Sequence, residues 1–198
     1  LAREALGPEI FLMVDANGNY TSDIARKSIR QLEGYNIHFY EEPLPPTDFD
    51  GYARLRPASH LPLATGEALY SAHDFKRLSD ANGADFWQPD LTLCGGFTVG
   101  NEISTLARVS HVRVSPHVWG GAIGLAAALH FSAAQVPWPH TDNIPEPALL
   151  EYDQGDTALR DEILKTPISC IDGYLIVPSG PGLGIELDWD IVDKYRVV

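Results

Sequence analysis

Short apolar runs, each closed by a polar residue, recur along the chain at a fairly steady interval. The runs are residues 10–14, 37–40, 61–64, 84–88, 112–115 and 148–150, and the residues that close them are Asp15, Glu41, Glu67, Asp90, His117 and Glu151. A short apolar run bounded by polar residues predicts a buried strand. Between the runs, residues 22–33, 72–81, 100–108 and 121–135 have the apolar spacing of helices. This alternation predicts a parallel sheet whose outer face is covered by helices.

Six repeated units with polar closing residues favour a barrel over a small open sheet. In a parallel barrel all strands end on one face, where the active site lies, so the six closing residues would converge there. We therefore predict the α/β class and, within it, a (β/α)8 barrel of the TIM type. A complete barrel has eight strands. Two units are expected before Leu1, which would make this chain a partial barrel from a longer polypeptide.

The repeating pattern stops after Glu151. Residues 140–147 are expected to form an inserted loop before the last strand, and residues 173–177 have the composition of a further strand beyond it. We predict two parts. Residues 1–152 would form the partial barrel, about strands 3 to 8, and residues 153–198 would form a C-terminal segment that closes it.

Three of the closing residues, Asp15, Glu41 and Glu67, are carboxylates that follow consecutive strands. Carboxylates that face one another repel strongly unless a cation lies among them. An all-oxygen ligand set selects a hard ion, and Mg²⁺ with open positions fits it best. Alternatively, each carboxylate caps the following helix or pairs with a neighbouring Arg or Lys. The same placement in three successive units favours the metal.

The next two strands end at Asp90 and His117, which would be neighbours on the rim of the barrel. A carboxylate beside an imidazole fixes its tautomer and raises its basicity, as a general base requires. The alternative is a rim histidine bonded to a backbone carbonyl. Glu151 could donate a hydrogen bond to a substrate carboxylate if it were protonated. Glu42 is expected to pack outside the site, because adjacent strand residues face opposite ways. Trp119 either lines the pocket or packs beneath a loop.

Composition excludes several classes of function. The formal net charge is −13, which disfavours nucleic acid and anionic membranes as partners. No apolar run approaches the roughly 18 residues that a membrane span needs. The two cysteines, Cys94 and Cys170, form no disulfide framework and have no metal-ligand spacing. A cytoplasmic protein is the expectation.

The sequence resembles the enolase superfamily, specifically its mandelate racemase subgroup, over nearly the whole chain. The segments that carry the resemblance are Val14-Asp15-Ala16-Asn17, Tyr40-Glu41-Glu42-Pro43, Ala64-Thr65-Gly66-Glu67, Gln88-Pro89-Asp90 with Gly95-Gly96 beyond it, Ser115-Pro116-His117 and, more loosely, Leu150-Glu151-Tyr152. Each tetrapeptide alone is weak evidence, whereas five in the right order at this spacing are a strong signal.

The resemblance implies that Asp15, Glu41 and Glu67 bind Mg²⁺. It also implies that His117, oriented by Asp90, is the acid/base, and that Glu151 helps to hold the enolate. The related muconate-lactonizing subgroup has a catalytic lysine around its sixth strand. Residues 90–94 contain no lysine, which favours the mandelate racemase subgroup. That subgroup has a second base on its second strand and an N-terminal α+β capping domain, both expected before Leu1.

The expected chemistry is abstraction of the proton next to the carboxylate of a small-molecule substrate. The first choice is dehydration of a sugar acid to a 2-keto-3-deoxy acid. A racemase or epimerase is the second choice and would need two bases on opposite faces of the α-carbon. A cycloisomerase is less favoured without the sixth-strand lysine, and a non-catalytic binding barrel would require vestigial carboxylates. Because relatives commonly assemble from barrels, a homo-oligomer is expected.

Overall fold

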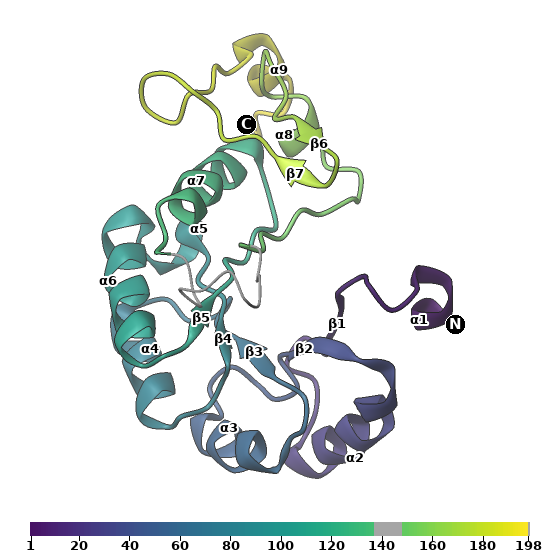
Figure 1. The fold of residues 1–198 in the computed structure, drawn as a ribbon. Helices are drawn as coiled ribbons and strands as arrows, with labels where there is room; N and C mark the ends of the chain where they lie inside the picture. The colour runs from purple at the N-terminus through teal and green to yellow at the C-terminus, as the bar shows by residue number, and fades with distance from the viewer. Residues whose placement is uncertain (137–147, 198) are drawn as a thin grey trace.

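The central element of the structure, a computed structural model that describes residues 1–136 and 148–197, is a parallel sheet. Its strands lie in chain order, β1-β2-β3-β4-β5. Their bounds are β1 (Leu12–Asp15), β2 (Ile37–Glu41), β3 (Leu63–Thr65), β4 (Phe86–Trp87) and β5 (Arg113–Val114). The strands follow an arc, with the helices along its outer side (Figure 1). The predicted α/β class with a parallel sheet is confirmed.

The helices that cover the arc follow the strands in turn. They are α2 (Ser22–Leu32), α3 (Phe49–Leu55), α4 (Ala72–Asp80), α6 (Gly96–Val109) and α7 (Ala122–Ala133), with short helices α1 (Ala2–Leu6) and α5 (Leu91–Cys94) and 3₁₀ turns at Glu33–Tyr35 and Arg56–Ala58. Side-chain caps define several helix starts, because each accepts an otherwise unpaired backbone N–H. Asp48 accepts from Gly51 N before α3, and Ser71 from Asp74 N before α4. α3 and α5 were not predicted, and α6 begins earlier than predicted.

The two faces of the sheet bury different side chains. On the outer face, strand residues pack against α2 and α3 in one cluster and against α4 and α6 in another. The inner face holds a smaller cluster that consists of Met13, Phe39, Ala64, Phe86 and Leu149. Alternation along each strand produces this division.

β2 departs from simple alternation through a bulge. Leu12 on β1 pairs with Ile37, but Val14, two residues later, pairs with Tyr40, three residues later. Ile37 and Tyr40 both lie in the outer cluster, whereas His38 and Phe39 both contact the inward-facing Phe86, with ring centroids 5.4 and 5.1 Å away. The bulge lets Tyr40 face outward and Glu41 inward. If all five residues of β2 alternated regularly, Glu41 would share the outward face of Ile37.

The prediction of a sixth strand at residues 148–150 is wrong. Within the described part of the chain, residues 148–150 have no strand conformation. Ser115 Oγ donates to Leu149 O at 3.3 Å. β5 has only two residues, so it offers few backbone groups with which a neighbouring strand could pair. The predicted loop at 140–147 lies outside the described residues.

The C-terminal segment packs against α7. It contains α8 (Ala158–Asp161), an antiparallel pair of β6 (Cys170–Ile171) and β7 (Tyr174–Leu175), and α9 (Trp189–Lys194). Its apolar residues share two clusters with α7 and the turn before it, and His130 Nε2 lies 3.0 Å from Leu183 O. The division at residue 152 stays a prediction. None of the helices in the described ranges has the length and apolar character of a membrane span.

Candidate active site

The predicted site residues follow the ends of the parallel strands. Asp15 and Glu41 are the last residues of β1 and β2 and are partners in the register of the sheet. Glu67 comes two residues after β3, Asp90 caps α5 after β4, and His117 comes three residues after β5. Parallel strands all end at one edge of a sheet, so these side chains gather on one side of the arc.

Asp90 and His117 form a hydrogen-bonded pair at the site. His117 Nδ1 lies 2.8 Å from Asp90 Oδ2. The other carboxylate oxygen, Oδ1, accepts from Thr92 N at 2.7 Å and from Thr92 Oγ1 at 2.6 Å. Burial opposes the charge on Asp90, but these hydrogen bonds outweigh it and lower the pKa of its carboxyl group. Asp90 is therefore ionised and fixed in place, and it orients the imidazole ring through Nδ1.

The second ring nitrogen of His117 faces two of the predicted carboxylates. Nε2 lies 3.5 Å from Glu67 Oε2 and 3.7 Å from Glu151 Oε2. Glu151 is held by the backbone N–H of Val118, which donates to Oε2 at 2.8 Å. Burial lowers the pKa of His117, but the bond to Asp90 and the charges of Glu151 and Glu67 outweigh it and raise the pKa to about 9. With no cation among these carboxylates, His117 is therefore protonated at neutral pH, and its Nε2 faces Glu67 and Glu151. A cation that offset their charge would lower this pKa and free Nε2 to act as a base.

The remaining carboxylates act on one another electrostatically. Burial and, to a smaller extent, the charges of Asp15, Glu151 and Glu67 together raise the pKa of Glu41 to about 7, against a hydrogen bond from Gln88. Burial also raises the pKa of Glu67, and Asp15 and Glu151 add to that effect. Asp15 accepts from the backbone N–H of Asn17 at 2.8 Å and from its side-chain amide at 2.5 Å. Repulsion from neighbouring carboxylates thus adds to burial in raising the pKa of Glu41 and Glu67.

The donor set fits a hard cation. Among the residues that the structure describes, no three His, Cys, Asp or Glu side chains already converge at metal-binding separation. Asp15, Glu41 and Glu67 nevertheless lie at the ends of three adjacent strands and supply only oxygen ligands. Burial and then repulsion from neighbouring carboxylates raise the pKa of Glu41, and a divalent ion would relieve that repulsion.

Sequence reasoning did not assign roles to three residues that contact the site. Asn17 and Thr92 bond to Asp15 and Asp90, as described above. Gln88 is 4% exposed and bonds to Glu41. Glu42, which was expected to pack outside the site, is buried and accepts from Thr65 Oγ1 at 3.2 Å. Burial and the charges of Glu67 and Asp15 raise its pKa to about 7, so it acts electrostatically on the site. Polar residues next to a strand end are the signal that could have identified the missed residues, but their partners depend on the fold.

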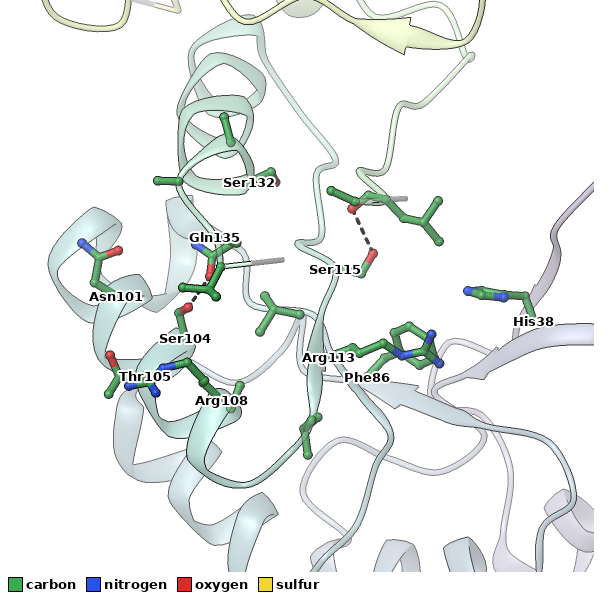
Figure 2. A pocket seen from close by; sticks show the side chains of 18 residues that line it. His38, Phe86, Asn101, Ser104, Thr105, Arg108, Arg113, Ser115, Ser132 and Gln135 are labelled. Carbon is green, nitrogen blue, oxygen red and sulfur yellow. Dashed lines mark hydrogen bonds between the residues drawn. The ribbon is translucent and has the colours of Figure 1, made fainter. Parts of the chain in front are cut away.

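The cavity in Figure 2 is separate from these residues. It measures about 620 Å³ and lies between α6, α7 and β5, and it is lined by residues that include His38, Phe86, Arg113 and Ser115. Ser104 and Gln135 face one another across the two helices. None of the six predicted site residues lines this cavity. Trp119 is 74% exposed, so it does not pack beneath any segment that the structure describes.

Comparison with known proteins places this arrangement in a family. A family model described as "Enolase C-terminal domain-like" matches residues 1–191. The chain belongs to the enolase superfamily. Its enolase-superfamily relatives include D-galactarolactone cycloisomerase of Agrobacterium fabrum, 40% identical over 98% of this chain and 51% of the relative. D-galactonate dehydratase of Ralstonia pickettii is 35% identical over 96% of this chain and 49% of the relative.

Solved structures of the enolase superfamily agree with the fold. The 3,6-anhydro-D-galactonate cycloisomerase of Zobellia galactanivorans has a TM-score of 0.88 and 38% identity, and the match covers 98% of this chain and 52% of that one. A racemase of Streptomyces coelicolor solved with bound magnesium has a TM-score of 0.83 and 28% identity, covering 99% and 49%. This chain spans about half the length of the curated relatives it matches. That share agrees with the prediction of a partial barrel.

Proposed function

We propose that the full-length protein dehydrates a sugar acid in a Mg²⁺-dependent reaction that begins with removal of the proton next to the carboxylate. The observation that carries the proposal is the position of His117, bonded to Asp90 through Nδ1 and facing Glu67 and Glu151 through Nε2. A carboxylate substrate fits this environment only if a cation offsets the charge of the acidic residues. Relatives named for galactonate and galactarolactone support a sugar acid as substrate.

Asp15, Glu41 and Glu67 would hold Mg²⁺, which supplies positive charge that offsets the charge growing on the substrate carboxylate. Asp90 keeps the His117 ring oriented and leaves Nε2 available for proton transfer. His117 takes the α-proton at Nε2, which breaks the C–H bond and forms the enolate. Glu151, held by the Val118 N–H, contacts the substrate on the same side.

His117 then returns its proton to the oxygen of the departing β-hydroxyl group. The carbon–oxygen bond breaks, water leaves, and the resulting enol tautomerises to the 2-keto-3-deoxy acid. One proton is taken from carbon and one is given to oxygen, so the residue ends in its starting state.

A cycloisomerase is a second candidate, because a relative that is 40% identical bears that name. The same proton would be removed, but the leaving oxygen would belong to the ring of a sugar lactone. The product would then have the mass of its substrate, whereas dehydration removes the mass of one water. Racemisation would also preserve the mass and would exchange the α-hydrogen.

The test is a screen of the full-length enzyme with Mg²⁺ against sugar acids and their lactones, read by mass spectrometry in deuterated water. The proposal predicts loss of water with one substrate, no product in EDTA, and no product from His117→Asn. The matched control is His130→Asn. His130 lies on α7 and bonds to Leu183 O, away from the candidate site, so this variant should retain activity. Turnover without loss of water would favour the cycloisomerase or a racemase, and activity that survives in EDTA would contradict the metal site.

A further inference from the structure

Gln88 is a buried polar residue at the centre of the candidate site that the mechanism above does not use. It follows β4, and its backbone N–H donates to Thr65 O at 3.1 Å, which continues the pairing of β4 with β3. Phe86, two residues earlier, faces the inner side of the sheet, and Trp87 faces the outer side. Alternation therefore directs the Gln88 side chain inward, toward the same side as Glu41.

The strand between Gln88 and Glu41 leaves room for this side chain to cross it. Ala64 on β3 pairs with Glu41 on one side and with Phe86 on the other. Its side chain is a single methyl group, and Gly66, which follows β3, has no side chain. The amide of Gln88 can therefore reach over β3 and donate to the Glu41 carboxylate.

The other end of the Gln88 amide has no partner. Its Oε1 is buried and accepts no hydrogen bond from any residue in the described ranges, although buried polar atoms are almost always paired. Its neighbours in the site are carboxylates, which accept hydrogen bonds when ionised and cannot satisfy a carbonyl oxygen. Mg²⁺ keeps several of its waters when it binds to proteins, and such a water would supply the missing donor.

We propose that Gln88 is a positioning residue that fixes the Glu41 carboxylate for Mg²⁺ and accepts a hydrogen bond from the water that the ion carries. The inference rests on the proposed function for the identity of the ion. The inference predicts a property that the proposed function does not, namely the affinity for Mg²⁺ in the absence of substrate. Residues that orient metal ligands typically change metal affinity by about 10- to 100-fold when they are replaced.

The experiment is a calorimetric Mg²⁺ titration of the full-length protein without substrate. Gln88→Met keeps the length of the side chain and removes the amide, and Gln88→Asn keeps the amide but shortens its reach. Both variants should bind Mg²⁺ about tenfold more weakly or worse. Gln135→Met is the matched control, because Gln135 bonds to Ser104 and to Phe131 O on the far helices, and it should bind as the wild type does.

The outcomes separate this inference from the proposed function. If the wild type binds Mg²⁺ but does not dehydrate sugar acids, weaker binding by the Gln88 variants still supports the positioning role. If the enzyme dehydrates a sugar acid and both variants bind Mg²⁺ as tightly as the wild type, the positioning role is overturned and the function stands. Wild-type protein that binds no Mg²⁺ overturns both. Loss of the fold in both variants, by circular dichroism, would assign Gln88 to the core and overturn the inference.

Discussion

At the scale of single residues, the Asp90 carboxylate combines two tasks. One oxygen caps the short helix α5 through Thr92, and the other holds the ring of His117. A side chain that is fixed at one oxygen has little freedom at the other. The orientation of the imidazole is therefore determined by the start of a helix, which is a rigid element.

Replacement of Asp90 by Asn should reduce kcat by about 10²- to 10⁴-fold, the range that positioned acid–base groups contribute. The neutral amide no longer stabilises the charged imidazolium and can donate to Nδ1, which selects the wrong tautomer. The measurement is steady-state turnover together with deuterium exchange at the α-carbon. Thr92→Val is the control, because the backbone N–H of residue 92 remains, and it should lose less than about tenfold. Equal rates for Asp90→Asn and the wild type would contradict the role of the pair.

Sequence reasoning predicted the positions of these residues better than their contacts. The ends of the apolar runs identified Asp15 and Glu41, which are the last residues of β1 and β2. The apolar pattern alone could not show that Glu41 faces inward, because that orientation depends on the bulge that forms when β2 pairs with β1. The contact between Gln88 and Glu41 could not be predicted from the sequence either, because it depends on the small side chain of Ala64 on the strand between them.

At the scale of elements, Asp85 joins three parts of the chain just before β4. Its Oδ1 accepts from Arg56 Nε at 3.0 Å and Nη2 at 2.8 Å, after α3, and its Oδ2 accepts from Leu63 N at 2.9 Å, at the start of β3. The bonds lie at the end of the sheet opposite the candidate site. They align β3 with β4 before either strand reaches its functional end.

Asp85→Ala should lower the free energy of unfolding by about 2–3 kcal/mol, because it removes charge-assisted bonds and leaves a half-buried N–H without its acceptor. Urea denaturation measures the change. Asp80→Ala is the matched control, since Asp80 pairs with Lys76 on the exposed surface of α4, and such pairs contribute about 1 kcal/mol or less. A loss at Asp85 no larger than at Asp80 would show that these contacts do not align the strands.

The turn after β3 is the second feature at this scale. Gly66 has a φ of 138°, and a Cβ at this position would lie 2.9 Å from Gln88 N and 2.9 Å from a ring carbon of Phe75. Neither the backbone nor the buried ring can move away easily. The close approach of β3 and β4, which places Glu67 beside the later strands, therefore requires glycine.

Gly66→Ala should destabilise the protein by about 1–3 kcal/mol through backbone strain and the close contacts. It should also weaken Mg²⁺ binding, because Glu67 follows directly. The control is Gly34→Ala, where an added Cβ meets nothing within 4 Å, and it should leave the melting temperature and the affinity unchanged. Thermal unfolding and Mg²⁺ titration of both variants make the comparison, and unchanged values for Gly66→Ala would refute it.

At the scale of the whole molecule, the net charge of −13 means that gathering several carboxylates at the strand ends destabilises the folded state. Repulsion within the site adds to the repulsion of a strongly acidic chain. The folded state thus carries an electrostatic penalty that a bound divalent ion would reduce. The ion is expected to act on stability as well as on chemistry.

Mg²⁺ should raise the melting temperature of the full-length protein by several degrees. A ligand at about 100 times its Kd contributes about 2.7 kcal/mol to the folded state. Differential scanning calorimetry measures the effect, with K⁺ at the same ionic strength as the control for screening. Asp15→Asn should lose most of the Mg²⁺-specific rise. An equal rise with K⁺ would mean that screening alone stabilises the protein.

The bulge at His38 and Phe39 has a consequence for how β2 tolerates change. Both side chains lie on the inner face, and together they reverse the orientation of every later residue of the strand. Substitution of either residue by another of similar size leaves the residue count, and so the orientation of Glu41, intact. Deletion of one of the two residues would restore regular alternation and would still leave Tyr40 outward and Glu41 inward. In a library of β2 variants, active clones should therefore include some that lack one residue of the bulge.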